Sequence, residues 1–259
     1  MIETRRIIPA LLLRGNGLYK TVKFKNPSYV GDPINAIRIF NEKEVDELMV
    51  LDIDATKKKS EPNFDLISDF ASECFMPLTY GGGISSLKQA EKIFSLGVEK
   101  ILVKSVLFSN INFLRELVEN FGSSAIVISL DVKKSIFNSY QLFVPKGVEN
   151  KNFSSLKIYI DEVNDCLPGE VLLNNTDRDG LMNGQDLKLI NFISKNFDVP
   201  LISLGGIGSI KDIRDSFEAG ADAVAAGAFF VYHGPHRAVL ITYPKKTEIR
   251  NLISSNEPS

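Results

Sequence analysis

A short apolar strand, a glycine-rich turn and a helical pattern occur twice in this chain, 123 residues apart. The first turn reads TYGGGIS at residues 79–85, and the second reads LGGIG at residues 204–208. The same spacing also separates Glu47 from Glu170, Asp54 from Asp177, Pro77 from Pro200, Gly97 from Gly220, and Lys104 from Gly227. A register kept without a gap over this length predicts a chain made of two similar halves.

Eight apolar runs typical of buried strands alternate with helical patterns along the 259 residues. We expect strands at residues 6–13, 47–53, 76–78, 100–103, 125–130, 170–174, 201–204 and 222–226. We expect helices at residues 35–44, 63–74, 86–97, 111–120, 156–164, 187–197 and 210–218. This order and length predict an α/β fold, a (βα)8 TIM barrel built from two fused half-barrels, rather than an open doubly wound sheet.

The repeat divides the predicted single domain, residues 1–259, into half-barrels over about 1–122 and 123–240. Residues 14–33 are polar and rich in glycine, which favours a mobile loop over a site. Residues 133–151 are irregular, and we expect them to contain a hairpin that lies near the barrel mouth and contacts another protein. The end of the chain, residues 244–259, has the composition of a solvated tail.

Each half carries a turn after its third strand and another after its fourth. A turn between a strand and a helix leaves backbone N–H groups free at the positive end of the helix dipole, which suits it to bind phosphate. Two such places on opposite sides of one mouth favour a small molecule with a phosphate at each end. The residues concerned are Gly82, Gly83, Lys104, Ser105, Gly205, Gly206, Gly227 and Ala228. In the alternative interpretation, the glycines only provide tight turns.

The composition argues against several classes of protein. A net charge of −2 offers no general attraction for nucleic acid or an anionic membrane. No apolar run approaches the roughly 20 residues of a membrane span, so we expect a cytoplasmic protein. The two cysteines lie far apart, and His233 and His236 flank a glycine-proline pair that argues against a helix. We therefore predict no metal site and no cofactor.

Several short motifs together resemble the HisF-type subunit of imidazole glycerol phosphate synthase. They are RRII at 5–8, VDEL and LDID within 45–54, GGGI at 81–84, FGS at 121–123, DRDG at 177–180 and AGADA at 219–223. The resemblance covers about residues 4–232. It implies a barrel that receives ammonia from a separate class I glutaminase of HisH type at its N-terminal face. The ammonia then passes to a bis-phosphate substrate at the C-terminal face, where Asp179 and Gly180 of the DRDG motif contact it.

The family's cyclase reaction uses two aspartates as acid and base, at the ends of the first and fifth strands. The fifth-strand aspartate is present as Asp131, but Leu12 stands at the first-strand position. Leucine cannot transfer a proton, and general acid–base catalysis commonly contributes about 10²–10⁴ in rate. Lys20 matches the lysine of the substrate-covering loop, and Asp54 adds a carboxylate at the mouth that could compensate. Lys104 stands where the cyclase usually has asparagine. The candidate catalytic residues are Asp131, Lys20 and Asp54.

The family's N-terminal entrance is ringed by an arginine, two glutamates and a lysine that gate the entry of ammonia. The matching residues are Arg6, Glu47, Lys100 and Glu170, each at the start of a predicted strand. Charges that face into the bottom of a barrel are costly unless they pair with each other. The resemblance therefore implies an ammonia gate here. The alternative is a salt-bridge plug that only caps the core.

One branch of the family resembles the chain more closely, through the sequence at residues 30–48 and HRAVLI at 236–241. Its members are encoded with bacterial surface-polysaccharide genes, and in them a paired glutaminase supplies ammonia to a separate sugar amidotransferase. The resemblance implies an ammonia-conducting barrel subunit, with the sugar amidotransferase at its C-terminal face. Two alternatives stay open: a working cyclase of histidine biosynthesis, and a related half-barrel sugar-phosphate isomerase.

Overall fold

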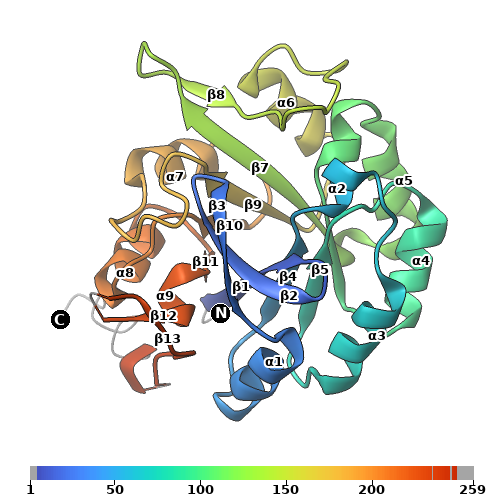
Figure 1. Ribbon diagram of the computed structural model, residues 1–259. Coiled ribbons are helices and arrows are strands. Elements are labelled where there is room, and N and C mark those ends of the chain that lie inside the picture. Colours follow the sequence, from blue (N-terminus) through green and yellow to red (C-terminus); the bar gives the residue numbers. More distant parts are fainter. Residues whose placement is uncertain (1–4, 235, 246, 250–259) are drawn as a thin grey trace.

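The computed structural model describes residues 5–234, 236–245 and 247–249 (Figure 1). Within them, eight parallel strands close into a barrel, because the last strand pairs with the first. Around the barrel they are β1 (Arg6–Arg14), β4 (Leu48–Asp52), β5 (Leu78–Gly81), β6 (Lys100–Val103), β7 (Ile126–Lys134), β9 (Glu170–Asn175), β10 (Leu201–Leu204) and β11 (Ala223–Ala226). The predicted TIM barrel is confirmed, and every predicted strand overlaps one of these eight.

Helices cover the outside of the barrel (Figure 1). The longer ones are α1 (Pro33–Glu42), α3 (Phe64–Glu73), α4 (Leu87–Ser95), α5 (Asn112–Phe121), α6 (Leu156–Asn164), α7 (Leu187–Ser194) and α8 (Ile210–Glu218). Shorter turns are α2 (Ala55–Lys58), η1 (Ser105–Phe108), η2 (Ser123–Ala125) and α9 (Ala228–Val231). No helix within the described ranges is both long and apolar enough to cross a membrane.

Most of the longer helices begin where the sequence offers a capping side chain. Six of them follow a Ser, Asp or Asn whose side chain accepts a hydrogen bond from the backbone N–H three residues later. The helix predicted over 35–44 begins earlier, at Pro33, because Asp32 caps it and proline suits the first helical position.

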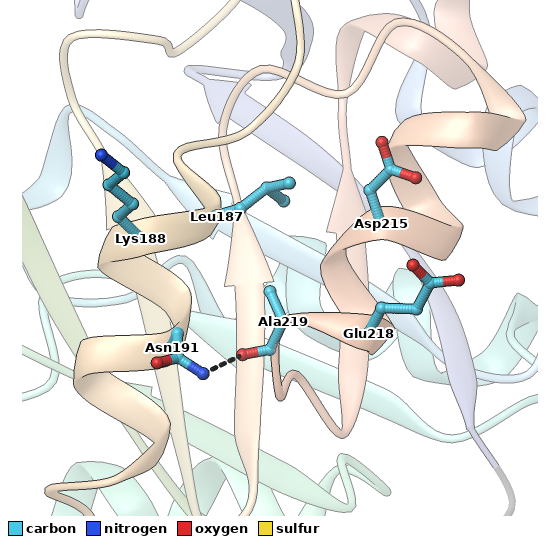
Figure 2. Close-up of a pocket in the computed structure, with 6 residues that line it drawn as sticks. All are labelled: Leu187, Lys188, Asn191, Asp215, Glu218 and Ala219. Carbon is cyan, nitrogen blue, oxygen red and sulfur yellow. Dashed lines mark hydrogen bonds between the residues drawn. The ribbon is translucent and has the colours of Figure 1, made fainter.

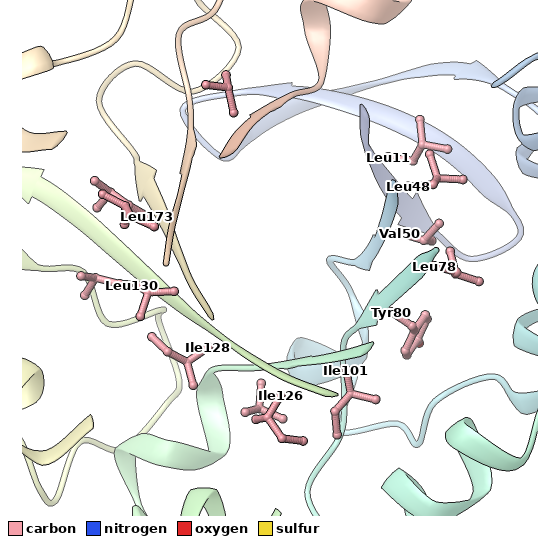
Figure 3. Packing of buried hydrophobic residues seen from close by; sticks show 14 of the residues in the cluster. Leu11, Leu48, Val50, Leu78, Tyr80, Ile101, Ile126, Ile128, Leu130 and Leu173 are labelled. Carbon is pink, nitrogen blue, oxygen red and sulfur yellow. The ribbon is translucent and has the colours of Figure 1, made fainter. Parts of the chain in front are cut away.

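The buried apolar residues form two separate clusters, one on each face of the closed sheet. The outer cluster lies between strands and helices and includes Leu11, Val50, Tyr80, Ile101 and Leu130 (Figure 3). The inner cluster fills the barrel itself and consists of Ile8, Ala10, Met49, Leu102, Val127, Leu172, Ile202, Ala223 and Ala225. Because both faces of each strand are covered, the strands read as nearly continuous apolar runs.

The 123-residue spacing reappears in the hydrogen bonds. The backbone N–H of Leu78 donates to Glu99 Oε2 at 2.7 Å, and that of Leu201 donates to Asp222 Oδ2 at the same distance. After the preceding strand, Asp54 N–H donates to Asp52 Oδ1 at 2.9 Å, and its counterpart at residue 177 donates to Asn175 Oδ1 at 3.0 Å. The two halves therefore share local contacts as well as residues, whereas the boundary near 122 stays a prediction.

The mobile loop predicted over 14–33 is wrong, because the structure forms a hairpin there. Strands β2 (Gly17–Val22) and β3 (Lys25–Gly31) pair with each other, and β2 extends the sheet beside β1. Leu18 is buried, and Tyr19 packs edge-to-face on Tyr29 with 5.6 Å between ring centroids. Glycines flank these apolar residues in the sequence, and for this reason the sequence predicted a loop instead of strands.

The hairpin expected within 133–151 is present, since β8 (Tyr140–Leu142) pairs antiparallel with β7. It projects from the barrel in Figure 1. A further two-stranded sheet joins β12 (Tyr232–His233) to β13 (Ala238–Val239). Of the predicted tail, residues 246 and 250–259 lie outside the described residues.

Candidate functional site

The four charged residues predicted at the barrel floor form a closed ring of ion pairs. Arg6 bonds Glu47 Oε2 through Nη1 at 2.6 Å and Glu170 Oε1 through Nη2. Lys100 Nζ donates to the same two carboxylates, at 3.0 Å and 2.9 Å. The charges alternate in sign, so each cation lies between two anions and each anion between two cations.

Burial makes this ring more than a surface salt bridge. Glu47 is 2% exposed and Glu170 is 7% exposed, and Thr79 Oγ1 donates a further bond to Glu47 at 2.8 Å. Burial acts to lower the pKa of Arg6, but Glu170 and Glu47 outweigh it and raise that pKa. The ring therefore pairs largely buried charges with one another, and its role as an ammonia gate stays a prediction.

At the opposite end, the predicted first-strand and fifth-strand positions face each other across the mouth. Strands β1 and β7 are four strands apart in either direction around the barrel. Side chains two residues apart on a strand point to the same face. Leu12 therefore shares the inward face of β1 with Ile8 and Ala10, and Asp131 shares the inward face of β7 with Val127. The structure thus places a leucine, and not a second acid, opposite Asp131.

Asp131 is bound to a lysine. Its carboxylate is 2% exposed, and Oδ2 accepts a hydrogen bond from Lys104 Nζ at 2.8 Å. Oδ1 accepts a longer bond from Ser129 Oγ at 3.4 Å. The sequence interpretation placed Lys104 at a phosphate turn and missed this pair. The signal was present, because Lys104 directly follows β6 and Asp131 lies on the neighbouring strand.

Lys20 belongs to β2 of the hairpin, and its side chain is buried. Its Nζ donates to the carbonyl oxygen of Ala10 at 2.7 Å, and the whole residue is 5% exposed. Burial lowers the pKa of Lys20 to about 8, although the charge of Asp179 opposes this. Its ammonium also lies at the turn after β11, where a Cβ on Gly227 would come within 2.5 Å of Nζ.

Each half-barrel has the side-chain ammonium group of a lysine at the turn after its fourth strand, but the lysine comes from a different part of the chain in each half. The 123-residue spacing matches Gly227 to Lys104, so the first half carries the cation on the turn itself. The second half receives it from Lys20 of the hairpin. Ser105 begins η1 and Ala228 begins α9. Both turns thus place a lysine side chain near the start of a short helix, and phosphate binding by Lys104, Ser105, Gly227 and Ala228 stays a prediction.

The hairpin is held down over the mouth by the DRDG loop. Asp179 Oδ2 accepts bonds from Thr21 Oγ1 at 3.2 Å and from the Phe24 N–H at 3.4 Å. Burial raises the pKa of Asp179, and these bonds only partly oppose it. A Cβ on Gly180 would lie 2.1 Å from the Thr21 carbonyl oxygen, so only glycine allows this approach. Asp179 and Gly180 therefore dock the hairpin, while contact with substrate stays a prediction.

Asp54 sits on another part of the rim. It accepts bonds from Arg14 Nε at 3.2 Å and Lys58 Nζ at 3.0 Å. Burial acts to raise the pKa of Asp54, but the bonds from Lys58 and Arg14 outweigh it and lower that pKa. The structure ties this carboxylate to cations beside β1 and β4, whereas Asp131 is bound on the β6–β7 side. It does not bring them together as an acid–base pair.

The backbone conformation at the turns after β5 and β10 explains why these positions are glycine. Gly82 and Gly83 have φ values of 134° and 72°, and Gly205 and Gly206 have 100° and 107°. Added Cβ atoms would also come too close to neighbouring residues, at 2.7 Å from Asp52 Cβ for Gly82 and 2.3 Å from the Gly184 carbonyl oxygen for Gly206. Packing thus accounts for the glycines, and phosphate binding by these turns stays a prediction.

A groove between α7 and α8 lies on the outer surface and contains none of the predicted site residues (Figure 2). Asn191 spans it with a 3.4 Å hydrogen bond from Nδ2 to the Ala219 carbonyl oxygen. Across the described ranges, no group of three or more His, Cys, Asp or Glu side chains is arranged to hold a metal ion.

Comparison with known proteins agrees with this geometry. Residues 6–236 match the sequence profile of the family described as "Histidine biosynthesis protein". The chain belongs to this family. It is 51% identical over 241 residues to a protein of Pseudomonas aeruginosa provisionally named imidazole glycerol phosphate synthase subunit hisF2, covering 93% of this chain and 96% of the relative.

Two further relatives define the range of similarity. One is a protein of Leptospira borgpetersenii that is provisionally named subunit HisF of the same synthase. It is 46% identical to this chain, and the match covers 94% of this chain and 96% of the relative. The other is subunit HisF of Alkaliphilus metalliredigens, whose name is not provisional. It is 34% identical to this chain, and the match covers 89% of this chain and 91% of the relative. The chain is thus a HisF-type barrel.

Proposed function

We propose that this HisF-like barrel is the ammonia-conducting subunit of a glutamine amidotransferase system. A separate HisH-type glutaminase would bind the N-terminal face and release ammonia at the charged ring. One observation carries the proposal: the ring of Arg6, Glu47, Lys100 and Glu170 is complete, while the mouth above it holds Leu12 in place of an acid and has its remaining acid tied to Lys104.

The barrel interior suits the passage of neutral ammonia. Between the ring and the mouth, most of the lining consists of the apolar side chains of the inner cluster, and Leu12 extends it to the top. The polar exceptions are Thr79, which bonds the ring, and Ser129, which bonds Asp131. An ion in such surroundings loses its hydration without compensation, whereas a small neutral molecule loses far less. Ammonium would therefore be held back, and opening of the ring would admit ammonia.

The acceptor in this proposal is a sugar undergoing amidination during surface-polysaccharide biosynthesis, bound by a sugar amidotransferase at the C-terminal face. Sequence similarity supports a branch apart from the ordinary synthase subunits. Among the relatives compared, those with provisional names are 36–51% identical to this chain, and those named HisF without reservation are 33–34% identical. We place the protein in the cytoplasm, where such intermediates are made.

The second candidate is the cyclase subunit of imidazole glycerol phosphate synthase in histidine biosynthesis. It is favoured by the names of the relatives and by the retained Asp131, Lys20 and paired turns for a bis-phosphate. In this candidate, Asp54 or Lys20 must supply the second proton-transfer group. The geometry disfavours Asp54, which is bound to two cations.

One assay separates the two. The purified chain is given the bis-phosphate substrate of imidazole glycerol phosphate synthase with an ammonium salt, beside the Alkaliphilus metalliredigens HisF as a positive control. We expect turnover lower by at least about 10², the usual contribution of an acid–base group. Comparable turnover, or rescue of a histidine auxotroph lacking HisF, would refute the ammonia-conducting proposal. Co-purification with a glutaminase, lost on reversing the charge of Glu47, would support the glutaminase contact at the floor, which both candidates share.

A further inference from the structure

Two of the three most exposed large apolar side chains in the described part of the chain lie side by side at the tip of the β7–β8 hairpin, residues 135–139. Ile136 is 95% exposed and Phe137 is 86% exposed. Because the carboxyl end of β7 lies at the mouth, the tip projects on the mouth side of the barrel (Figure 1). Holding both side chains in water forgoes the favourable free energy of apolar burial, and exposed apolar groups of this kind mark contact sites.

The turn that carries these side chains has a defined shape. Ser135 N–H donates to the Ser139 carbonyl oxygen at 2.8 Å. Ser135 Oγ accepts hydrogen bonds from the N–H groups of Phe137 and Ser139, both at 3.2 Å. Asn138 adopts the left-handed conformation, with a φ of 62°, which asparagine tolerates in turns. The backbone of the tip is thus fixed by its own bonds, and Ile136 and Phe137 point into solvent.

The base of the hairpin is held on two sides. On one side, Lys134 Nζ and the Tyr140 hydroxyl donate to the two carboxylate oxygens of Asp186, at 2.8 Å and 3.1 Å, and the Tyr140 ring stacks on α7. On the other side, Phe143 packs edge-to-face on Phe24 of the β2–β3 hairpin, with 5.6 Å between ring centroids. The tip is therefore a supported projection, and little conformational entropy remains to be lost when a partner binds it.

The two hairpins that meet at the mouth are rich in lysine. Residues 17–31 contain three lysines and no acidic residue, and residues 133–151 contain four lysines and one glutamate, although the net charge of the whole chain is −2. Lys23, Lys25 and Lys146 are exposed, and no carboxylate among the described residues pairs with them. An apolar tip beside exposed cations complements a protein pocket that is apolar inside and acidic at its rim.

The acidic residues closest to this surface are already engaged. Asp177 Oδ2 accepts a hydrogen bond from Lys134 N–H at 2.7 Å, and Asp186 is bonded by the same lysine through its Nζ. Asp179 accepts bonds from the β2–β3 hairpin. These carboxylates therefore hold the two hairpins in place, and they leave the exposed lysines to attract a partner.

We propose that the β7–β8 hairpin is the docking element for the sugar amidotransferase, whose apolar, acid-rimmed pocket receives the tip. The inference rests on the proposed function, because ammonia that leaves an open mouth is lost to water unless the acceptor enzyme covers it. A projection at the rim holds such an enzyme over the mouth without blocking it. A second copy fits less well, since lysines would meet lysines in a symmetric contact. An anionic membrane fits less well, since the chain is negative overall.

The first test measures the Kd between the full-length protein and the purified sugar amidotransferase of the same bacterium by calorimetry. In Ile136→Ser/Phe137→Ser, we expect the Kd to rise by about 30-fold or more, as truncation of central apolar contacts usually does. Phe75→Ser is the matched control, because Phe75 is 87% exposed but lies between α3 and β5, at the floor. It should leave the Kd unchanged. If the double variant is unstable, Phe137→Ser alone replaces it.

A charge-reversal pair tests the lysines separately. In Lys23→Glu/Lys25→Glu, we expect association with the amidotransferase to slow by about tenfold at low salt, because complementary charge acts mainly on the association rate. Lys88→Glu/Lys92→Glu makes the same change of charge on the outer helix α4 and should leave the rate unchanged. Equal slowing in both pairs would mean that the net charge of the chain, and not this surface, steers the partner.

Several outcomes would overturn the docking inference. They are a wild-type affinity too weak to measure, an unchanged Kd in the tip variant, and an equal loss in Phe75→Ser. Two further assays use the tip variant with other partners: sedimentation of the chain alone, and binding to vesicles of phosphatidylserine and phosphatidylcholine. If the tip substitutions abolish self-association or vesicle binding and leave the amidotransferase Kd unchanged, the hairpin serves a second copy or a membrane instead.

The second test separates this inference from the proposed function. The chain, its glutaminase, the amidotransferase and the sugar substrate are combined and supplied with either glutamine or an ammonium salt. We expect Ile136→Ser/Phe137→Ser to lose about tenfold or more of the glutamine-dependent amidination and to keep the glutaminase activity and the ammonium-dependent amidination. Full glutamine-dependent amidination in this variant would refute docking through the hairpin while the proposed function stands. If the wild type supports no glutamine-dependent amidination, the proposed function fails and the docking inference fails with it.

Discussion

The floor and the mouth of this barrel both contain charged residues, but they hold them in different ways. At the floor, Arg6, Glu47, Lys100 and Glu170 lie at or next to the first residues of barrel strands and satisfy one another in a closed ring. At the mouth, Asp131 lies on β7, but the other charges come from loops and a hairpin, and they bond to rim cations, serine or backbone. A site made by strand ends is specified by the barrel itself, whereas a site made by loops can change while the barrel persists.

The largest effect is expected from breaking the floor ring. Glu47→Gln leaves Arg6 and Lys100 to share one carboxylate in a buried setting. Removing one member of a buried ionic network typically costs about 3–5 kcal/mol of unfolding free energy, and we expect a loss in that range. Urea unfolding measures it, with Glu73→Gln as the control, because Glu73 pairs with Arg38 on the exposed surface. Equal losses in both variants would show that the floor behaves as an ordinary surface pair.

The next effect is a pH dependence that originates at the mouth. Burial lowers the pKa of Lys20 to about 8, from an ordinary value of 10.5. Between these values the unfolded chain binds more protons than the native one, so this lysine makes stability rise with pH across that window. We expect the unfolding free energy of wild type minus that of Lys20→Met to grow by up to about 3 kcal/mol between pH 7.5 and 10. A constant difference, measured by urea unfolding, would contradict this assignment.

A smaller effect should come from releasing the hairpin. In Gly180→Ala the new Cβ would lie 2.1 Å from the Thr21 carbonyl oxygen, in addition to the strain of a φ of 70°. Gly15→Ala has a similar φ of 58° and open space around it, so it serves as the strain-only control. We expect Gly180→Ala to cost about 1–3 kcal/mol more, the usual range for overpacking. Trypsin cleavage after Lys23 or Lys25 should also become faster, and equal cleavage in both variants would argue that the hairpin is not docked through Gly180.

The smallest effect on stability is expected at the tip of the β7–β8 hairpin. Ile136 is 95% exposed and Phe137 is 86% exposed, on a turn closed by a 2.8 Å bond from Ser135 N–H to the Ser139 carbonyl oxygen. Replacing both with serine should change the unfolding free energy by less than about 0.5 kcal/mol, as exposed sites usually do. A larger loss, seen by urea unfolding, would mean that this hairpin packs on the barrel and is not a free contact surface.

Sequence reasoning succeeded where local pattern and barrel geometry agree. The strand and helix positions followed from apolar periodicity. The floor ring was predicted from the resemblance to the family, and its members lie at or next to the start of barrel strands, as expected. Sequence reasoning failed at residues 14–33, where glycines suggested a loop but Leu18, Tyr19 and Tyr29 form a hairpin. It also missed the bond between Lys104 and Asp131, because side chains from neighbouring strands meet only once the sheet has closed.

The order of residues alone determined that this chain makes a two-part barrel, since the repeated spacing and the alternation of strands and helices are properties of the linear sequence. It also determined that Leu12 cannot act as an acid. Only the tertiary structure decided how the remaining charges are used: it pairs Asp131 with Lys104, Asp54 with Arg14 and Lys58, and leaves Lys20 with a carbonyl oxygen. The reason is physical, because the state of a charged group depends on the groups that folding brings within a few ångströms of it and on the water that folding removes.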